Sequence, residues 1–525
     1  MDNAELSDPD STADVVVVGA GPVGLVCALL LARCGHRITV LERWVAPYPQ
    51  PRAVHFDDEV ARLLADAGIG DRLRDLSEPA NLYEWRNGDG ETLLRFDWSG
   101  FGPAGWPRAS MFHQPHLEQA LAEEASRTDG LKVLRGCEVV ELTDAGDQVT
   151  VVTRNVSGDR RVFTASWVVG CDGANSVVRA SMKTSTVDLG FFYDWLIVDA
   201  IPNEPRIWDP LNLQICDPDR PTTVVSGGPG RRRWEFMRMP GETIDELNNE
   251  EAAWKLLAPW GFTPDNCSVE RHAIYTFQAR WAETWRRGRM LIAGDSAQLM
   301  PPFAGQGMCS GIRDAANLAW KLDLVLREIA PTRLLDTYSS ERRAHVQHAI
   351  AMSVELGKVI CVTDPDEAAK RDAFMTGQGA DPAKILPPLP PLTLTDGVIY
   401  RNPQGSPAPG AGTLTPQPQV TVAGRAGLLD DVVGPGFVLL CADDPQSYLA
   451  DEENEFLDVL VTNRVVVDSP RQLLPLGMEC EAALIRPDHY LFGSATRMAD
   501  LPAIVNDLRK QLDSVTTRSV GSARQ

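Results

Sequence analysis

A glycine-rich turn near the start of the chain constrains the fold more than any other feature. Gly19, Gly21 and Gly24 form a GxGxxG pattern directly after the β-branched run 14–18 and at the start of an apolar, helix-like stretch. These glycines allow a tight turn, close approach of a pyrophosphate and close helix–strand packing, and the helix N-terminus offers amide groups to the phosphates. Glu42 ends the next strand-like run, where a carboxylate can bind ribose hydroxyls. The sequence therefore predicts a dinucleotide-binding βαβ unit and leaves open whether the ligand is FAD or NAD.

The balance of charge excludes several classes of partner. The 525 residues include 50 Lys and Arg against 72 Asp and Glu, a formal net charge of −22. Nucleic acid and anionic membranes require basic patches, so neither is predicted as a partner. Ten cysteines lie scattered without a CxxC pair, and neither a zinc site nor a disulfide framework is predicted. Residues 1–13 are polar and acidic and the longest apolar run, 25–32, is too short to cross a bilayer, so we expect a cytoplasmic protein.

A second motif lies near residue 300. Asp295 follows a strand-like run, a Pro-rich turn comes next, and Gly305-Gln-Gly307 opens a helix. Asp295 is placed to bind a polyol hydroxyl, and the glycines let backbone amides surround a planar ring where a helix N-terminus stabilises negative charge. A plain strand–turn–helix crossover would show the same spacing, so both interpretations stay open.

A third motif, CDGANSVVR, covers residues 171–179 and follows the strand-like run 167–170. Its acid, Asp172, could bind a cofactor. The same carboxylate could equally cap the turn that follows it.

These three motifs, in this order and at these separations, resemble the class A FAD-dependent aromatic hydroxylases, which have the para-hydroxybenzoate hydroxylase fold. The resemblance covers roughly residues 14–355. It is sharpest to the 3-(3-hydroxyphenyl)propionate hydroxylase branch, to which four further segments are similar, namely 51–54, 112–115, 216–221 and 233–243. The chain departs from the family at Gln298, where His is usual, and from that branch at His55, where Gly is usual.

The resemblance implies an FAD-dependent monooxygenase that uses NADPH or NADH. One oxygen atom of O2 would enter a phenolic ring through a flavin C4a-hydroperoxide, in a site that excludes water. The implied substrate is a phenolic acid like 3-(3-hydroxyphenyl)propionate. One alternative is a tailoring hydroxylase of a larger phenolic or pyridinol natural product, such as a polyketide, and another is a flavoprotein that does not hydroxylate. The expected partners are a small phenol and O2, and a homo-oligomer is left open.

The same resemblance assigns roles to individual residues. FAD contacts are expected from Gly19, Gly21, Gly24, Glu42, Arg43, Arg52, Gln114, Asp172, Arg179, Asp295, Gly305, Gly307 and Met308. Pro301 and Pro302 would bound the site of oxygen transfer, and His55 and Tyr193 are candidates for the base that activates the phenol. Substrate contacts are expected from Trp195, Arg220, Arg233, Phe236 and Phe303. The alternative is that the arginines are solvated near a hairpin tip and that the aromatic residues belong to the core of the sheet. No metal ligand is expected.

The predicted fold class is α/β, with a Rossmann-type FAD-binding domain, an antiparallel-sheet substrate domain and a C-terminal thioredoxin-like domain. The expected segments are a disordered tail at 1–13, the FAD-binding domain at 14–189 with an insert near 80–105 that joins the substrate layer, the substrate-binding sheet at 190–280, the second part of the FAD-binding domain with long helices at 281–384, a Pro- and Gly-rich linker at 385–417, and the thioredoxin-like domain at 418–515. The last domain lacks CxxC, so we expect a packing or oligomerisation role for it. Within it, the run 456–467 is predicted to be a strand.

Overall fold

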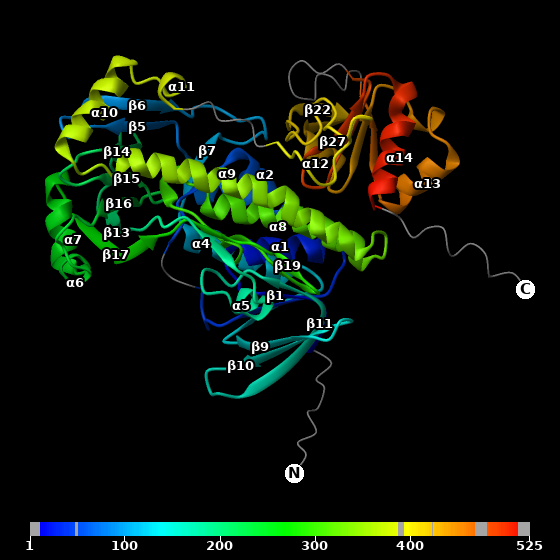
Figure 1. The fold of residues 1–525 in the computed structure, drawn as a ribbon, viewed down its shortest axis with the longest axis horizontal. Coiled ribbons are helices and arrows are strands. Elements are labelled where there is room, and N and C mark those ends of the chain that lie inside the picture. The colour runs from blue at the N-terminus through cyan, green and yellow to red at the C-terminus, as the bar shows by residue number, and fades with distance from the viewer. Residues whose placement is uncertain (1–10, 48–50, 387–392, 423, 468–479, 513–525) are drawn as a thin grey trace, which may run out of the picture.

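The computed structural model describes residues 11–47, 51–386, 393–422, 424–467 and 480–512. Figure 1 shows a parallel-sheet domain in the middle, a seven-stranded sheet at one end and a C-terminal domain at the other. Two long helices, α8 (Gly307–Leu326) and α9 (Asp336–Ile360), cross the middle of the molecule. They connect the regions that the sequence predicts as separate layers.

The parallel-sheet domain is built on an eight-stranded sheet. Its order is β19-β20-β11-β1-β2-β8, with β9 and β10 attached to β11, and β1 runs parallel to both of its neighbours. The strands are β1 (Thr12–Val18), β2 (Ile38–Glu42), β8 (Leu131–Arg135), β9 (Glu138–Asp144), β10 (Val149–Arg154), β11 (Arg160–Gly170), β19 (Arg286–Arg287) and β20 (Met290–Ile292). Thr12 and Ala13, which the sequence assigned to a tail, pair with β11 because their backbone extends the ladder of the buried valines. Residues 1–10 of that tail lie outside the described residues.

Helices cover this sheet and explain why its central strands are apolar on both faces. Helix α1 (Pro22–Arg33) begins with a proline, whose missing amide hydrogen costs nothing at a helix start, and it packs against α8. The other helices of the domain are α2 (Asp58–Leu64), α3 (Leu73–Leu76), α4 (Gln114–Arg127) and α5 (Val177–Met182). Two small sheets complete it, one of β3 (His55–Asp57), β7 (Ala109–Phe112) and β4 (Ser77–Pro79), and one of β12 (Thr186–Asp188), β18 (Arg280–Ala282) and β21 (Gln298–Leu299).

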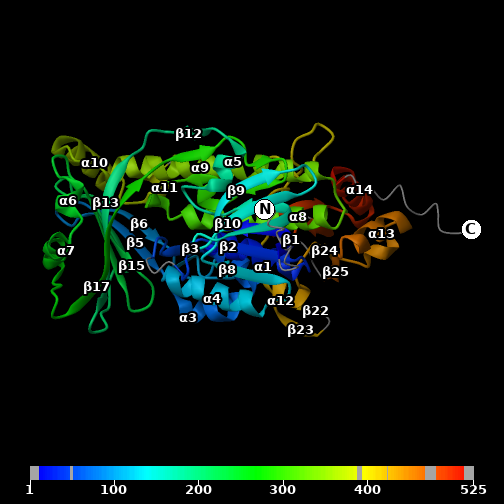
Figure 2. The ribbon, with the colours of Figure 1, turned by 90° about the horizontal axis from the view of Figure 1, so that it is seen from below.

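The seven-stranded sheet has the order β17-β13-β16-β15-β14-β5-β6 and is antiparallel except between β14 and β5. Its strands are β5 (Leu82–Arg86), β6 (Thr92–Asp97), β13 (Tyr193–Pro202), β14 (Asn212–Ile215), β15 (Thr222–Ser226), β16 (Arg232–Met237) and β17 (Cys267–Phe277). One face carries α6 (Ile244–Leu247) and α7 (Glu250–Leu257), as Figures 1 and 2 show. We call the other face, which turns toward the parallel-sheet domain, the inner face. Strands β5 and β6 come from the segment expected to join this layer.

Helices α10 (Pro365–Gly377) and α11 (Pro382–Ile385) follow α9 and lie beside β6. Among the described residues, no single helix is both long and apolar enough to cross a membrane. Thr332–Ile360 and Pro365–Gly377 meet that test only as a pair, across a bend of 112°.

The C-terminal domain has a four-stranded sheet of order β25-β24-β26-β27, in which β24 and β25 are parallel and the other pairs are antiparallel. This is a thioredoxin-like arrangement. Its elements are β22 (Gln419–Val422), β23 (Arg425–Leu428), α12 (Leu429–Val433), β24 (Val438–Cys441), α13 (Asp451–Val459), β25 (Asn463–Val466), β26 (Ala482–Ile485), β27 (Leu491–Ala495) and α14 (Leu501–Leu512). The strand predicted at 456–467 is wrong in its first part, because Phe456, Leu457 and Leu460 share the buried face of α13 and its end.

The segment 393–417 has few regular elements but is anchored to the protein. Leu394, Ile399 and Ala411 are buried in one apolar cluster with Tyr490 of the C-terminal domain. Val398 donates its amide hydrogen to Glu341 of α9, at 2.8 Å. The described part of the expected linker is therefore a packed connection between two domains, because its apolar residues and backbone amides find partners on both.

Candidate active site

The glycine turn has the geometry that its sequence predicts. Gly19 adopts a φ of 103°, and a Cβ there would lie 2.4 Å from the carbonyl oxygen of Cys171. A Cβ on Gly24 would lie 2.0 Å from the carbonyl oxygen of Gly19. Gly21 caps α1, and nothing lies within 4 Å of where its Cβ would be. The turn is therefore closed on the protein side and open where a ligand would approach the helix N-terminus.

Glu42 braces this turn from the end of β2. Its Oε2 accepts a hydrogen bond from the amide of Ala20 at 2.8 Å, and its Oε1 accepts one from the amide of Trp44 at 2.9 Å. Arg43 is exposed, with its guanidinium 5.2 Å from the centre of the Trp44 ring. Glu42 therefore lies beside the glycine turn, as a ribose-binding acid should.

The second and third motifs meet at Ser296. The Asp172 carboxylate accepts hydrogen bonds from the hydroxyls of Ser176 (2.5 Å) and Ser296 (3.0 Å) and from the amide of Val177 (2.6 Å) at the start of α5. Arg179 donates to the carbonyl oxygen of Ser296 at 2.9 Å. Asp172 thus caps the following helix and, at the same time, ties together two chain segments more than a hundred residues apart.

Asp295 differs from Asp172 because it has no such partners. It lies in the short turn Gly294–Ser296, and no hydrogen bond between described residues reaches its carboxylate. Burial raises its pKa, and the charge of Arg52 opposes that effect. A small hollow opens here, lined by Arg179, Thr186, Arg280, Trp281, Ala282, Asp295, Ala297, Gln298 and Leu299. A half-buried carboxylate without a hydrogen bond beside this hollow fits a ligand that brings hydroxyl groups, as the ribityl chain of FAD does.

The loop expected to bound the site of oxygen transfer packs on His55. Pro301 is buried, whereas Pro302 is exposed and begins the turn Pro302–Ala304. Gly305 adopts a φ of 64°, and a Cβ there would lie 2.8 Å from Nδ1 of His55. Nδ1 of His55 lies 3.4 Å from the Gly305 carbonyl oxygen, and burial lowers the pKa of this histidine. Gly307, the first residue of α8, and the partly buried Met308 follow this loop.

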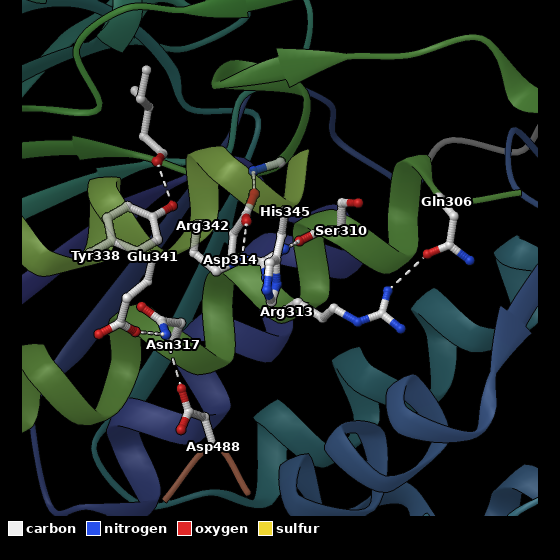
Figure 3. Close-up of polar contacts among 12 residues, drawn as sticks. Gln306, Ser310, Arg313, Asp314, Asn317, Tyr338, Glu341, Arg342, His345 and Asp488 are labelled. Atoms are coloured by element: carbon white, nitrogen blue, oxygen red, sulfur yellow. Dashed lines mark hydrogen bonds and ion pairs between the residues drawn. The ribbon is translucent and has the colours of Figure 1, made fainter. Parts of the chain in front are cut away.

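Arg313, which sequence reasoning missed, fixes the start of α8. Its guanidinium donates to Gln306 Oε1 at 2.9 Å, to Asp57 Oδ2 at 2.6 Å and to Glu59 Oε2 at 2.6 Å. Gln306 is the residue before α8, and its contact with Arg313 is visible in Figure 3. Tyr490 of the C-terminal domain donates to the other oxygen of Glu59 at 3.0 Å. A charged residue inside a buried helix was the available signal in the sequence.

Helix α9 supports the Asp295 turn from behind. Asp314 accepts a hydrogen bond from the amide of Gly294 at 3.2 Å, and Arg342 donates to its other oxygen at 2.8 Å. Tyr338 donates to the carbonyl oxygen of Ile292, at the end of β20, at 2.8 Å. Figure 3 shows Asp314, Tyr338 and Arg342 gathered between α8 and α9.

A second polar cluster joins these helices to the C-terminal domain. Glu341 forms ion pairs with Lys321 at 2.8 Å and with Arg486 at 2.7 Å, and Arg486 also pairs with Asp488 at 2.6 Å. Asn317 donates to both Glu341 (2.7 Å) and Asp488 (2.9 Å), as Figure 3 shows. All five side chains are buried. The C-terminal domain is therefore bound to the two helices that carry the Asp295 turn.

One group at this interface has ligand atoms close enough for a metal. Asp66, Asp430 and His489 place these atoms within 4.8 Å of one another. Arg62 donates to both oxygens of Asp430, at 2.5 and 2.7 Å, and His489 lies 2.6 Å from Asp66. The Arg62 guanidinium already supplies a positive charge to these acids, so the arrangement is explained without a metal ion.

Aromatic residues of the inner face meet the oxygen-transfer loop. The ring of Phe303 lies 5.7 Å from Trp195, 5.6 Å from Phe277 and 6.3 Å from Phe191, measured between ring centres. Tyr193 lies beside Phe191, at 4.9 Å. A Cβ on Gly357 of α9 would lie 2.8 Å from Phe303 and 2.7 Å from Phe191. The expected residues Tyr193, Trp195 and Phe303 are therefore brought together, and an unpredicted glycine makes room for them.

Two residues expected to contact the substrate have other surroundings in the structure. Phe236 pairs with Leu196 and packs in the cluster under α7, on the face opposite Trp195, because side chains alternate along a strand. Arg220 is held by Glu242, at 2.5 and 3.0 Å, and by the carbonyl oxygen of Met237 at 2.9 Å. Its guanidinium is therefore held by the end of β16 and the loop that follows it.

Arg233 and Gln114 hold the segment 51–53 against the inner face. Arg233 pairs with Asp199 at 2.6 Å and donates to the carbonyl oxygens of Arg52 (2.7 Å) and Pro51 (2.9 Å). Gln114 Oε1 accepts hydrogen bonds from the amides of Arg52 and Ala53, at 2.9 and 2.8 Å. Both side chains bind backbone groups of residues 51–53, and they therefore hold the backbone of Arg52 in place.

Comparison with known proteins agrees with this arrangement. Residues 12–353 match the family described as "FAD binding domain", and residues 412–479 match the "HcaD C-terminal domain". The chain is 35% identical to a "Probable NADH-specific resorcinol 4-hydroxylase" of Rhodococcus jostii (strain RHA1), over 96% of both chains. It is 36% identical to a "3-(3-hydroxy-phenyl)propionate/3-hydroxycinnamic acid hydroxylase" of Mycolicibacterium smegmatis, over 83% of this chain and 78% of that one. Its structure is similar to the flavin-dependent monooxygenase PieE in complex with FAD and substrate, with a TM-score of 0.78, 20% identity, and 96% and 100% of the two chains covered.

The fold and the comparisons define a flavoprotein monooxygenase that hydroxylates phenolic rings with FAD, a nicotinamide reductant and O2. Within that class, the chain belongs to the FAD binding domain family, which accounts for residues 12–353. The resemblance inferred from the three motifs is confirmed, as is the Rossmann-type α/β fold with its additional C-terminal domain.

Proposed function

We propose that the chain hydroxylates a small phenol without a carboxylate, of the resorcinol type. The supporting observation is that Arg233 of the inner face is engaged by the protein itself, with Arg271 beside the same acid. Arg233 holds Asp199 and two carbonyl oxygens, and Arg271 donates to the carbonyl oxygen of Pro51 and lies 3.6 Å from Asp199. A substrate carboxylate bound by Arg233 would have to displace Asp199 from a buried ion pair, which is unfavourable.

The relative that aligns over nearly the full length of both chains supports the same substrate class and NADH as the reductant. The phenylpropionate hydroxylase relative leaves about a fifth of its own chain unmatched. A phenolic acid, which the sequence predicted, and a larger natural product are therefore the alternatives against which the proposal is tested.

We also propose how FAD is held. The turn from Gly19 to Gly24 would bind the pyrophosphate, Glu42 the adenosine ribose, and Asp295 the ribityl chain. When bound and reduced by a nicotinamide, FAD supplies the activated oxygen. The protein's own contribution is to orient the phenol: Phe303 and Trp195 exclude water beside it, and the Arg313 contacts keep the start of α8 in place.

The test is NADH and NADPH oxidation by the FAD-loaded protein, with peroxide measured in parallel. Resorcinol is expected to stimulate NADH oxidation strongly, with little peroxide and with a hydroxylated product. Stronger stimulation by 3-(3-hydroxyphenyl)propionate, or by a bulky polycyclic phenol alone, would contradict the proposed substrate class. Stimulation in which all reducing equivalents appear as peroxide would contradict hydroxylation of that phenol.

The remaining expectations from the sequence stay predictions. These are a cytoplasmic location, no nucleic-acid or membrane partner, no metal, and a homo-oligomer as an open alternative. The net charge of −22 supports the absence of a nucleic-acid or membrane partner. Light scattering of the purified protein measures the last.

A further inference from the structure

Glu235 occupies a distinctive place on the inner face. It lies in β16, where it faces Ile197 of β13 and Thr223 of β15 across the sheet, and it is 8% exposed. Arg233, two residues before it, contacts segment 51–52. Met237, two residues after it, pairs with Trp195, which contacts Phe303. Glu235 therefore lies between two of the points at which the sheet contacts the parallel-sheet domain.

The Glu235 carboxylate has no hydrogen-bond partner among the described residues. Its nearest cation is Nη1 of Arg233, 3.7 Å from Oε1, and that guanidinium is already paired with Asp199 at 2.6 Å. Burial raises the pKa of Glu235, and the charges around it act in both directions: Arg233 and Arg271 lower it and Asp199 raises it. A buried carboxylate in this state is costly unless a ligand donates a hydrogen bond to it.

The inner face near Glu235 carries several aromatic side chains. Tyr83 belongs to the same face, and its ring lies 5.4 Å from Trp98, which lies 5.9 Å from His55. Burial, followed by Cys216 and Glu235, raises the pKa of Tyr83 well above its usual range. The hydroxyl of Tyr83 therefore keeps its proton at neutral pH.

The two bases suggested by the sequence are less suited to accept a proton. Burial, followed by Cys361, raises the pKa of Tyr193, so its hydroxyl is not ionised at neutral pH. Burial lowers the pKa of His55, and its Nδ1 already faces the Gly305 carbonyl oxygen. Burial raises the pKa of Glu235, which makes its carboxylate a stronger base toward a phenol proton as electron density moves into the ring.

We propose that Glu235 is a catalytic residue that binds the hydroxyl group of the phenol and takes its proton as the ring is hydroxylated; this rests on the proposed function. The phenol O–H bond breaks, its proton goes to a carboxylate oxygen of Glu235, and its electron pair moves into the ring toward the carbon that forms the new C–O bond. That carbon then loses its hydrogen as a proton, which restores the aromatic ring. One atom of O2 enters the ring and the other leaves as water, with the two electrons supplied by NADH or NADPH.

The test compares Glu235→Gln with a matched control, Glu84→Gln, in the FAD-loaded protein. Glu84 is also a buried glutamate of this sheet, but it alternates with Tyr83 and Trp85 on β5, points to the opposite face, and pairs with Arg86 at 2.6 Å. With whichever phenol the wild type hydroxylates, Glu235→Gln is expected to lose about 100-fold or more in kcat. Its rate should then rise with pH toward the phenol's own pKa, about 10, whereas the wild-type rate falls only on the acidic side. Glu84→Gln should match the wild type.

Choosing the phenol from the wild-type assay separates the two proposals. A wild type that ignores resorcinol but hydroxylates another phenol contradicts the substrate class and leaves Glu235 to be tested on that phenol. A Glu235→Gln variant with wild-type kcat and pH profile overturns the role of Glu235. Partial recovery in Glu235→Asp supports it.

A measurement on the wild type alone covers the case in which Glu235→Gln does not fold. The probe is 4-nitrophenol, whose phenolate absorbs visible light, titrated with pH while bound to the FAD-loaded protein. A carboxylate acceptor at the hydroxyl disfavours the phenolate, so the pKa of the bound probe is expected to rise above its value in water. A lowered or unchanged pKa would overturn the proposal.

Discussion

Replacing Arg486 by Met tests how strongly the C-terminal domain is bound to the cofactor domain. Arg486 is fully buried, pairs with Glu341 at 2.7 Å and Asp488 at 2.6 Å, and donates to the carbonyl oxygen of Val398 at 2.9 Å. Methionine fills most of the volume but, among the residues that the structure describes, leaves the two carboxylates with Lys321 as their one paired cation. Breaking a buried ion pair from one side costs about 3–5 kcal/mol, because the remaining charge is buried without compensation. We expect a loss of that size in the free energy of unfolding at neutral pH.

The loss should depend on pH in a defined direction. Burial would raise the pKa of Glu341, but Arg486 and Lys321 outweigh it and lower the pKa to about 2. Because the folded pKa lies below the ordinary value of about 4.3, this stabilisation is present above that value and is lost as the pH falls toward 2. In Arg486→Met, protonation relieves the unpaired carboxylates. The difference between wild type and variant is therefore expected to narrow across the same pH range.

Urea unfolding measures both effects, with far-UV circular dichroism for the whole chain and flavin fluorescence for release of FAD. Arg497→Met is the matched control, because Arg497 lies in the same domain but forms an exposed ion pair with Asp500, at 2.9 Å. The control should unfold like the wild type. A loss below about 1 kcal/mol in Arg486→Met, or a larger loss that is the same at every pH, would refute the reasoning.

Three further predictions concern the site itself. In Gly24→Ala the new Cβ would lie 2.0 Å from a backbone oxygen of the glycine turn, so we expect the protein to lose most of its bound FAD, measured by flavin absorbance. The control Gly377→Ala, whose Cβ would meet open space, should retain FAD. Equal FAD content in the two variants would contradict this expectation. Asp295→Asn removes the charge that a polyol hydroxyl would meet, and the Kd for FAD is expected to rise about tenfold, equivalent to about 1.4 kcal/mol; an unchanged Kd would exclude Asp295 from FAD binding. Gly357→Ala places a Cβ 2.8 Å from Phe303, so we expect more peroxide per NADH oxidised, whereas an unchanged ratio would mean that Phe303 does not guard the site.

The parallel-sheet domain was predictable because its signals are local. The glycine turn, the β-branched run before it and Glu42 lie within one βαβ unit, and each has a residue type that only a few structures tolerate. The face on which a strand residue lies was harder to predict. Phe236 and Glu235 are neighbours in the sequence, yet they point to opposite sides of the sheet, and no short-range pattern says which side faces the flavin.

The polar interior was not predictable, because its partners are distant in the chain. Lys321 and Arg313 stand out inside α8, but their partners come from other elements, and Glu341 is satisfied only when the chain returns at Arg486. A similar limit explains the error over 456–467. Phe456 and Leu457 read as part of an apolar strand, whereas Glu453, which accepts the amide hydrogen of Ala450 at 2.6 Å, marks the start of a helix.

The contacts at the two ends of helix α9 constrain the number of residues between them. Near its start Glu341 holds the C-terminal domain and Arg342 holds Asp314, and about 24 Å further along Gly357 makes room for Phe303. Inserting one residue between Arg342 and Gly357 would rotate one set of contacts against the other by about 100°. We therefore expect sequences with this architecture to vary freely on the exposed side of α9 while keeping the number of residues between these two points fixed.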